Sequence, residues 1–280
     1  MPRGTAASGP FVPEGTEPEP SPRWTDLRVR LLSGAAMVLL GVVAIRLGGV
    51  WFQMLAVFVT GVMIWELARM IRPGEETVAM LLAALTASVL SGLLSTQAGW
   101  HLLLLFVPAA LGAAAMPRER LTFFLYGVAI MTAGWGLVTF RDTHGGTWLF
   151  WLVIVVVVTD IAGYFAGRAI GGPKFWPRVS PKKTWAGTAA GWIGAAAVGA
   201  LFLAFTDAGR DLIWISMLLS FASQMGDIAE SALKRRMGVK DSSALIPGHG
   251  GLFDRFDGLL GAALFMLLVA LVVDVPEVRI

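Results

Sequence analysis

The densest polar stretch of an otherwise apolar chain runs from residue 231 to 257. It contains cations that can contact phosphates, carboxylates that can hold a hard divalent cation, and glycines that let the backbone approach a bulky anion. These groups are Lys234, Arg235, Arg236, Lys240 and Arg255; Asp241, Asp254 and Asp257; and Gly248, Gly250 and Gly251. Their combination between two apolar segments indicates phosphoryl or nucleotidyl transfer at a membrane face.

A polar stripe precedes this stretch on one face of a predicted helix. Asp227, Glu230, Ser231 and Lys234 follow one another at helical spacing within an apolar run. An ionisable group at bilayer depth costs a few kcal/mol, and such groups are functional by default. The structural alternative is an Asp–Lys ion pair that only joins helices. We favour function, because the stripe leads directly into the polar stretch.

A second polar group follows the apolar run that ends at Thr159. Asp160, Tyr164 and Arg168 recur every four residues and point one way along a predicted helix. The same spacing on another side gives a face for close helix packing, formed by Gly163, Gly167 and Gly171. Asp160 can lie near a metal ion or the substrate, or it can merely pair with Arg168 along its own helix.

The segment Ser180-Pro181-Lys182-Lys183-Thr184 stands before a further apolar run. A serine and a threonine flank the lysine pair at a predicted helix start, where free N–H groups and the helix dipole favour anions. The segment therefore predicts a phosphate-binding site. The alternative is that Lys182 and Lys183 are ordinary positive anchors at the membrane surface.

Other residue types restrict the chemistry. The chain has no cysteine, which excludes disulfides, thiolate catalysis and cysteine-ligated metals. It shows no Ser-His-Asp arrangement, and a single histidine is a poor metal site, so we interpret His249 as a hydrogen-bond donor to phosphate. Glu66 and Arg69 lie three residues apart beside Trp65. We interpret them as a pair at the membrane edge without a catalytic role.

Taken in order, residues 231–257 resemble the signature of the CDP-diacylglycerol synthase (phosphatidate cytidylyltransferase) family. The shared pattern is Ser231, Lys234-Arg235, Lys240-Asp241, Pro247-Gly248-His249-Gly250-Gly251, Asp254-Arg255 and Asp257. A second block agrees with it and comprises Thr159-Asp160, Gly163-Tyr164-Phe165, Gly167-Arg168 and residues 179–185. One departure is Ser243, where the family pattern leads us to expect glycine. The resemblance is strong over residues 155–260 and weak before them.

This resemblance implies a reaction in which CTP and phosphatidate give CDP-diacylglycerol and pyrophosphate, for phospholipid biosynthesis. It implies Mg²⁺ held principally by Asp227 and Asp254, with Asp160 and Asp257 as further metal ligands, and it leaves open a second cation. The implied catalytic residues are Asp227, Asp254, Lys234, Lys240, Asp241 and His249. The implied substrate-binding residues are Ser180, Lys182, Lys183, Thr184, Arg235, Gly250, Gly251 and Arg255.

The elements that position these groups are predicted to be helices in a membrane. Of the 280 residues, 56% are hydrophobic and 15% charged, with mean hydropathy +0.71, whereas soluble proteins carry about 25% charged residues. We predict an all-α polytopic membrane protein with about nine spans of about 20 residues each. They cover residues 29–47, 50–70, 78–95, 99–115, 121–140, 147–168, 185–206, 211–233 and 258–275.

Loop charges orient this arrangement. With the N-terminus in the cytoplasm, eighteen Lys and Arg residues lie inside and four outside, which satisfies the positive-inside rule. Both polar blocks then face the cytoplasm from the inner (cytoplasmic) membrane. Residues 1–23, rich in proline, read as a disordered tail, and residues 24–280 as one membrane domain. The glycine-rich faces permit a homodimer without requiring one.

Two other functions have less support in the sequence. Acidic residues within a membrane could line the ion path of a transporter or channel, but no internal repeat is visible and the polar residues gather at one face. The second is a related membrane transferase that uses another nucleotide or a polyprenyl or archaeal lipid; the signature argues against it, although apolar spans do not reveal the acceptor pocket. The basic residues lie in short loops, so bilayer orientation and phosphate binding account for the pI of about 9.6 without nucleic acid.

Overall fold

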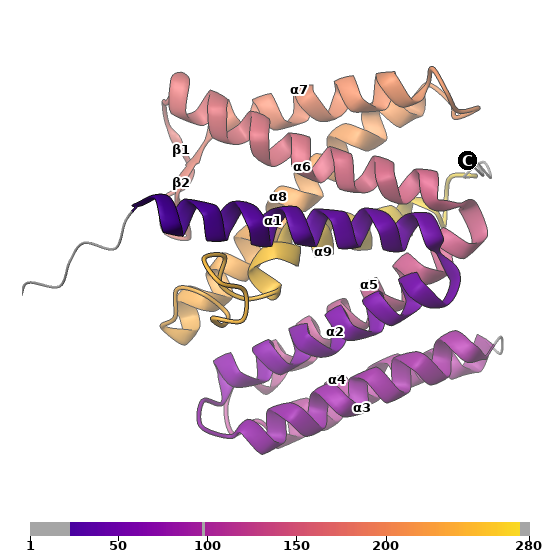
Figure 1. Cartoon of the computed structure of the whole chain (residues 1–280), viewed down its shortest axis with the longest axis vertical. Helices are drawn as coiled ribbons and strands as arrows, with labels where there is room; N and C mark the ends of the chain where they lie inside the picture. The colour runs from indigo at the N-terminus through magenta and orange to yellow at the C-terminus, as the bar shows by residue number, and fades with distance from the viewer. Residues whose placement is uncertain (1–22, 97–98, 275–280) are drawn as a thin grey trace, which may run out of the picture.

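The computed structural model describes residues 23–96 and 99–274. Apart from one short hairpin, the described chain is helical, which confirms the predicted all-α class (Figure 1). The predicted tail lies outside the described residues, except for Arg23. The elements are α1 Arg23–Leu47, α2 Gly49–Ile71, α3 Glu76–Ser95, the 3₁₀ helix η1 Gly99–Leu105, α4 Phe106–Ala115, α5 Arg120–His144, α6 Gly146–Ala169, β1 Lys174–Trp176, β2 Ser180–Thr184, α7 Trp185–Phe202, α8 Asp211–Met237 and α9 Phe253–Val269.

Each of the nine predicted spans overlaps a helical segment, although α7 ends at Phe202 and α9 at Val269, before the predicted ends, and residue 275 lies outside the described residues. Seven of the described helices are long and apolar enough to cross a membrane, namely α1, α2, α3, α5, α6, α7 and α8. The predicted fourth span divides into η1 and α4, and α4 has 10 residues, about 15 Å of helix against a hydrocarbon core of about 30 Å. The ninth predicted span corresponds to α9, which begins at Phe253, earlier than predicted, and has 17 residues.

A two-stranded antiparallel hairpin joins α6 to α7, where the sequence predicted no strand. Lys174 pairs with Thr184 and Trp176 with Ser180. Gly171 and Gly172 both adopt positive φ, and the prolines that follow them stop the helix, since proline lacks the N–H that a helix requires. Ser180 to Lys183 therefore lie in β2 and not in a helical first turn, while Thr184 is the residue that caps α7 as predicted.

The helices pack as two groups around a central pair. In Figure 1, α6 and α7 lie on one side, α2 to α5 lie on the other, and α8 and α9 run between them. One core cluster is built mainly from α6, α7, α8 and α9, and another mainly from α2, α3 and α5. The position of α9 between the groups lets its first turn contact residues from both.

Glycines allow two helix pairs to approach closely. On α6, Gly163 lies against Gly187 of α7, and Gly167 lies beside Thr184, which confirms two residues of the predicted packing face. The third, Gly171, lies beyond the helix and has open space around it. Gly226 of α8 lies against the backbone at Asp257 and Gly261 of α9. This second approach brings Asp227 beside the first turns of α9.

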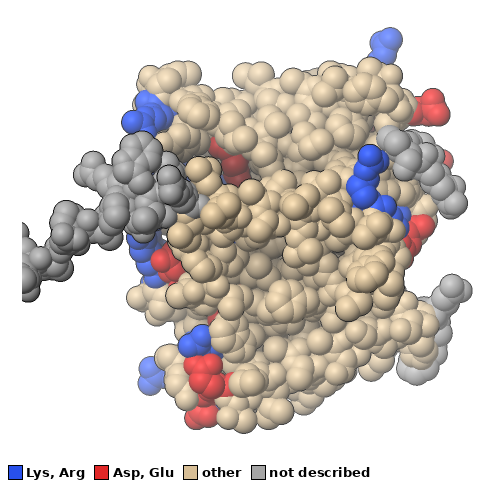
Figure 2. Space-filling view, viewed as in Figure 1, with Lys and Arg blue, Asp and Glu red and all other residues tan. Residues whose placement is uncertain are grey.

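The topology collects the polar segments at one end of the bundle. The C-terminal ends of α6 and α8, the hairpin, and the N-terminal ends of α1, α7 and α9 meet there. Figure 2 shows charged side chains concentrated at two opposite ends of the molecule, with a surface nearly free of Lys, Arg, Asp and Glu between them. This distribution is the one expected of a protein surrounded by lipid along its middle.

Candidate active site

The signature glycines fold residues 246–250 into a tight turn. The N–H of His249 donates to the carbonyl of Ile246 at 2.9 Å, and the N–H of Ile246 donates to the carbonyl of Gly250 at 2.8 Å. Pro247 occupies the second turn position and Gly248, with φ 75°, the third, which is the residue pattern of a type II turn. The turn shapes the loop that leads into α9.

Asp254, in the first turn of α9, organises this loop. Its Oδ2 accepts hydrogen bonds from the N–H of Gly251 at 2.7 Å and from the N–H and hydroxyl of Ser242, each at 2.8 Å. Its Oδ1 contacts Lys234 Nζ at 2.5 Å. Burial acts to raise the pKa of Asp254, but Lys234 and the N–H groups outweigh it and hold this pKa below its ordinary value. The side chain is only 4% exposed.

Lys234 lies between two carboxyl groups. Besides Asp254, its Nζ contacts Glu230 Oε2 at 2.6 Å, and the Glu230 side chain is 1% exposed. The predicted stripe on α8 therefore exists, with Ser231 donating to Asp227 at 3.3 Å. Glu230 was noted in the sequence only as part of this stripe. The structure makes it the second anchor of Lys234.

Asp227 connects the two signature blocks. Its Oδ2 lies 2.5 Å from Nζ of Lys183 on β2, so residues 44 positions apart in the chain form an ion pair. The Asp227 side chain is 32% exposed, far more open than Asp254. Lys182, next to Lys183, is exposed, and Ser180 is half-buried. The hydroxyl of Thr184 accepts from the N–H of Gly187 at 3.1 Å and caps α7.

Two further carboxyl groups surround Asp227. Asp160 lies within electrostatic reach of Lys183, Asp227 and Arg255. Asp257 lies within reach of Asp227 and Asp160. Arg168 donates to the hydroxyl of Tyr164 at 3.1 Å, so the alternative of an Asp160–Arg168 pair is not what the structure contains. Asp160, Asp227 and Asp257 are therefore close enough to influence one another electrostatically, and Lys183 pairs with Asp227 among them.

The remaining predicted residues lie around this centre with different degrees of exposure. His249 Nδ1 is 2.8 Å from the hydroxyl of Ser33 on α1, and Arg255 Nε donates to the carbonyl of His249 at 2.9 Å. Asp241 lies close to Gly250 and, like Lys240 and Arg235, is exposed. The structure therefore brings the predicted loop residues together, with Arg255 bound to backbone.

Glu66 of α2 is the residue that the sequence interpretation missed. It does not pair with Arg69, which instead contacts Glu76 at 2.9 Å and lies over the Trp65 ring. Glu66 is completely buried and accepts hydrogen bonds from the signature loop. A lone glutamate in an apolar span was the available signal, because an ionisable group at such a position is functional by default.

The donor chemistry suits a hard cation, although no complete site is assembled. Within the described residues, no three His, Asp or Glu side chains are arranged to hold a metal ion. The oxygens of Asp254 are engaged by Lys234, Ser242 and Gly251, whereas Asp227 has one ion pair and a longer contact to Ser231. Asp160, Asp227 and Asp257 offer carboxylate oxygens, the ligand type that Mg²⁺ prefers.

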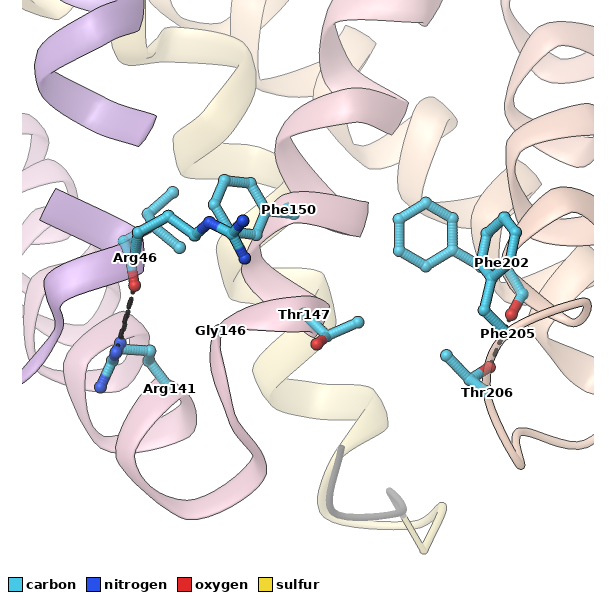
Figure 3. A pocket seen from close by; sticks show the side chains of 9 residues that line it. Arg46, Arg141, Gly146, Thr147, Phe150, Phe202, Phe205 and Thr206 are labelled. Carbon is cyan, nitrogen blue, oxygen red and sulfur yellow. Dashed lines mark hydrogen bonds between the residues drawn. The ribbon is translucent and has the colours of Figure 1, made fainter. Parts of the chain in front are cut away.

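A cavity of about 260 Å³ lies at the other end of the same helices. Figure 3 shows Arg46, Phe150 and Phe202 around it, with Arg141 donating to the carbonyl of Ile45 at 3.1 Å. The lining comes from the C-terminal ends of α1, α5 and α7 and the N-terminal end of α6. It includes no signature residue, so this cavity is separate from the candidate active site.

Comparisons with known proteins identify similar chains. Over part of its length, the chain is 47% identical to a phosphatidate cytidylyltransferase of Brucella suis biovar 1 (strain 1330), across 139 residues that cover 49% of this chain and 52% of the relative. It is 41% identical to the Bacillus subtilis (strain 168) protein of that name, across 122 residues covering 42% and 45%.

These matches span about half the length of the curated relatives. A profile of the cytidylyltransferase family, in contrast, matches residues 28–273, which include both signature blocks and nearly all of the described helices. The resemblance predicted from the two motifs is confirmed, and the chain belongs to the cytidylyltransferase family.

Proposed function

We propose that this protein transfers the cytidylyl group of CTP to phosphatidate, giving CDP-diacylglycerol and pyrophosphate. The observation that carries the proposal is the ion pair between Lys183 and Asp227, which joins the two blocks at one end of the bundle. Cations for a triphosphate and carboxylates for a divalent metal then lie side by side. The names of the relatives supply the same substrates.

The proposed chemistry needs no general base. The phosphate of phosphatidate has a second pKa near 6, so it is largely a dianion at pH 7. One of its oxygens attacks the α-phosphorus of CTP, the bond from that phosphorus to the oxygen bridging to the β-phosphate breaks, and pyrophosphate leaves with the electron pair. The protein has to bring two anions together and stabilise charge on the leaving group.

The carboxylates would support the reaction by holding a cation that neutralises phosphate charge. A bound Mg²⁺ would neutralise phosphate charge and orient the triphosphate, and Asp227, Asp160, Asp257 and Asp254 are the residues that would hold it. Lys183 would exchange its contact with Asp227 for one with a phosphate. Lys234 would keep Asp254 and the loop in place.

The proposed site faces the cytoplasm from the inner membrane, where CTP is available. The distribution of Lys and Arg between loops supports this orientation. Both blocks belong to one chain, so a single copy contains all the residues assigned to the reaction.

Pyrophosphate release from purified protein tests the proposal. We expect release only when CTP, Mg²⁺ and phosphatidate are all present, with CDP-diacylglycerol formed in equal amount. Chelation of Mg²⁺ should stop the reaction, and readdition should restore it. Equal rates with ATP, or release that does not depend on phosphatidate, would contradict the assigned substrates.

A further inference from the structure

Glu66 forms an enclosed hydrogen-bond centre beneath the signature loop. Its Oε1 accepts from the N–H of Leu252 at 2.9 Å and the hydroxyl of Ser243 at 2.5 Å. Its Oε2 accepts from the N–H of Phe253 at 2.6 Å. The hydroxyl oxygen of Ser242 lies 3.3 Å from Oε2 but only 2.8 Å from Asp254 Oδ2, so its single proton is within reach of both carboxyl groups and closer to Asp254. Each carboxyl oxygen of Glu66 thus accepts one backbone N–H and has a serine hydroxyl beside it.

The Glu66 carboxyl group takes the place of an N-terminal side-chain cap, which α9 lacks. No side chain of the residue preceding α9 caps it, and the first N–H groups of any helix have no partner within the helix. The carboxyl group of Glu66 accepts from the N–H of Phe253, the first residue of α9, and from that of Leu252 just before it. The helix dipole favours a negative charge at this end. A residue from α2, far away in sequence, therefore fixes where α9 begins.

The same carboxyl group is linked to the candidate active site. Ser242 lies between two carboxyl groups, because its hydroxyl is within hydrogen-bond distance of both Glu66 and Asp254. Gly251 packs so closely on Glu66 and Ser242 that a side chain there would collide with both. Glu66 thus holds both sides of the loop that presents His249, Gly250 and Asp254.

We propose that Glu66 is a positioning residue for cytidylyl transfer, acting through the loop of residues 242–253. This inference rests on the proposed function, since the loop matters to catalysis only if the site is the one described. Glu66 is completely buried and, among the described residues, its carboxyl oxygens contact only the loop and the start of α9. It sets the place of Asp254 and of the turn, so that substrates bind to a loop that is already in shape.

Glu66→Gln tests the proposal sharply. Glutamine keeps the size but turns one acceptor into a donor. A serine hydroxyl can rotate to accept from that amide, whereas a backbone N–H cannot, so the variant must lose the bond to Leu252 or to Phe253. We expect kcat per folded enzyme to fall about 10- to 100-fold, as for other outer-shell residues, with a higher KM for CTP. Glu76→Gln, which breaks only the contact with Arg69 near the same end of α2, is the matched control.

The activity of the wild-type protein separates a failure of the proposed function from a failure of the positioning role of Glu66. Wild-type activity with CTP and phosphatidate supports the proposed function, and its absence overturns that function independently of Glu66. If the wild type is active and Glu66→Gln keeps its kcat and KM, losing only the amount of folded protein, the positioning role is wrong.

If Glu66→Gln does not fold, serine variants test the positioning role of Glu66. Ser242→Ala and Ser243→Ala keep both backbone bonds, and each should lower kcat about fivefold, the usual effect of one hydrogen bond. Unchanged kcat in both would overturn the proposal. Where Glu66→Gln does fold, combining it with Ser243→Ala, whose hydroxyl donates to Glu66 and not to Asp254, should give no further loss. Losses that multiply would show that the residues act independently.

Discussion

At the residue scale, the two aspartates expected to be the principal metal ligands have different surroundings. Asp227 is partly open and has one cationic partner, Lys183. Asp254 is enclosed and accepts from Lys234, Ser242 and Gly251. An open carboxylate can exchange its partner for a metal ion or be reached by substrate, while an enclosed one mainly fixes the loop around it.

This difference predicts a contrast between two variants. Asp227→Asn and Asp254→Asn should each lower turnover about 100- to 1000-fold at any Mg²⁺ concentration, the scale of a lost charge contact in an active site. Only Asp254→Asn should also lower the melting temperature in detergent, because it leaves Lys234 beside a neutral amide. Asp142→Asn, at the other end of the bundle, is the control. More than about a tenth of wild-type activity in Asp227→Asn would contradict its role as a metal ligand, and the same result in Asp254→Asn would contradict any essential role for Asp254 at the site.

At the element scale, the hairpin separates two neighbouring lysines that the sequence treated alike. Successive side chains of a strand point to opposite faces, and on β2 Lys183 faces Asp227 while Lys182 is exposed. A helical first turn, as predicted, would have placed both lysines near the same anion. The strand makes Lys183 the stronger candidate for contact with the triphosphate.

Single variants test this assignment. Lys183→Gln should raise the KM for CTP about 10- to 100-fold, the usual value of a hydrogen bond between charged groups. Lys182→Gln should change it only about twofold, as for an exposed charge. Membrane orientation should be unchanged in both, since the loop-charge bias survives either loss. Equal effects of the two substitutions would mean that the strand does not determine which lysine binds CTP.

At the scale of the whole molecule, the two polar ends have different roles. The signature blocks lie at one end, and the cavity near Arg46 lies at the other. The seven long apolar helices run between these ends. One end should therefore face the cytoplasm, with the other on the opposite side of the membrane.

Cysteine labelling checks this orientation, because the natural chain has no cysteine. Arg178→Cys in the hairpin and Leu245→Cys in the signature loop should react with an impermeant thiol reagent in inside-out vesicles. Asp207→Cys, after α7, should react in right-side-out vesicles instead. Labelling of the first two from opposite sides would show that the blocks do not share a membrane face.

The sequence alone determined the helices and the contacts between near neighbours within them. Apolar runs of sufficient length form helices because the backbone must satisfy its own hydrogen bonds in lipid. Helical spacing placed Ser231 beside Asp227 and Lys234 beside Glu230, as the structure contains them. The two signature motifs likewise identified most residues that meet at the polar end.

Only the tertiary structure decided which distant residues became partners. Lys183 with Asp227, Ser33 with His249, and Glu66 with the start of α9 all depend on which helices are neighbours. Apolar faces carry little information on that choice, because one lipid-facing helix resembles another in hydropathy. The hairpin was missed because short strands between prolines lack a hydrophobic period. Glu66 was misread because its nearest charge in sequence, Arg69, was not its partner in space.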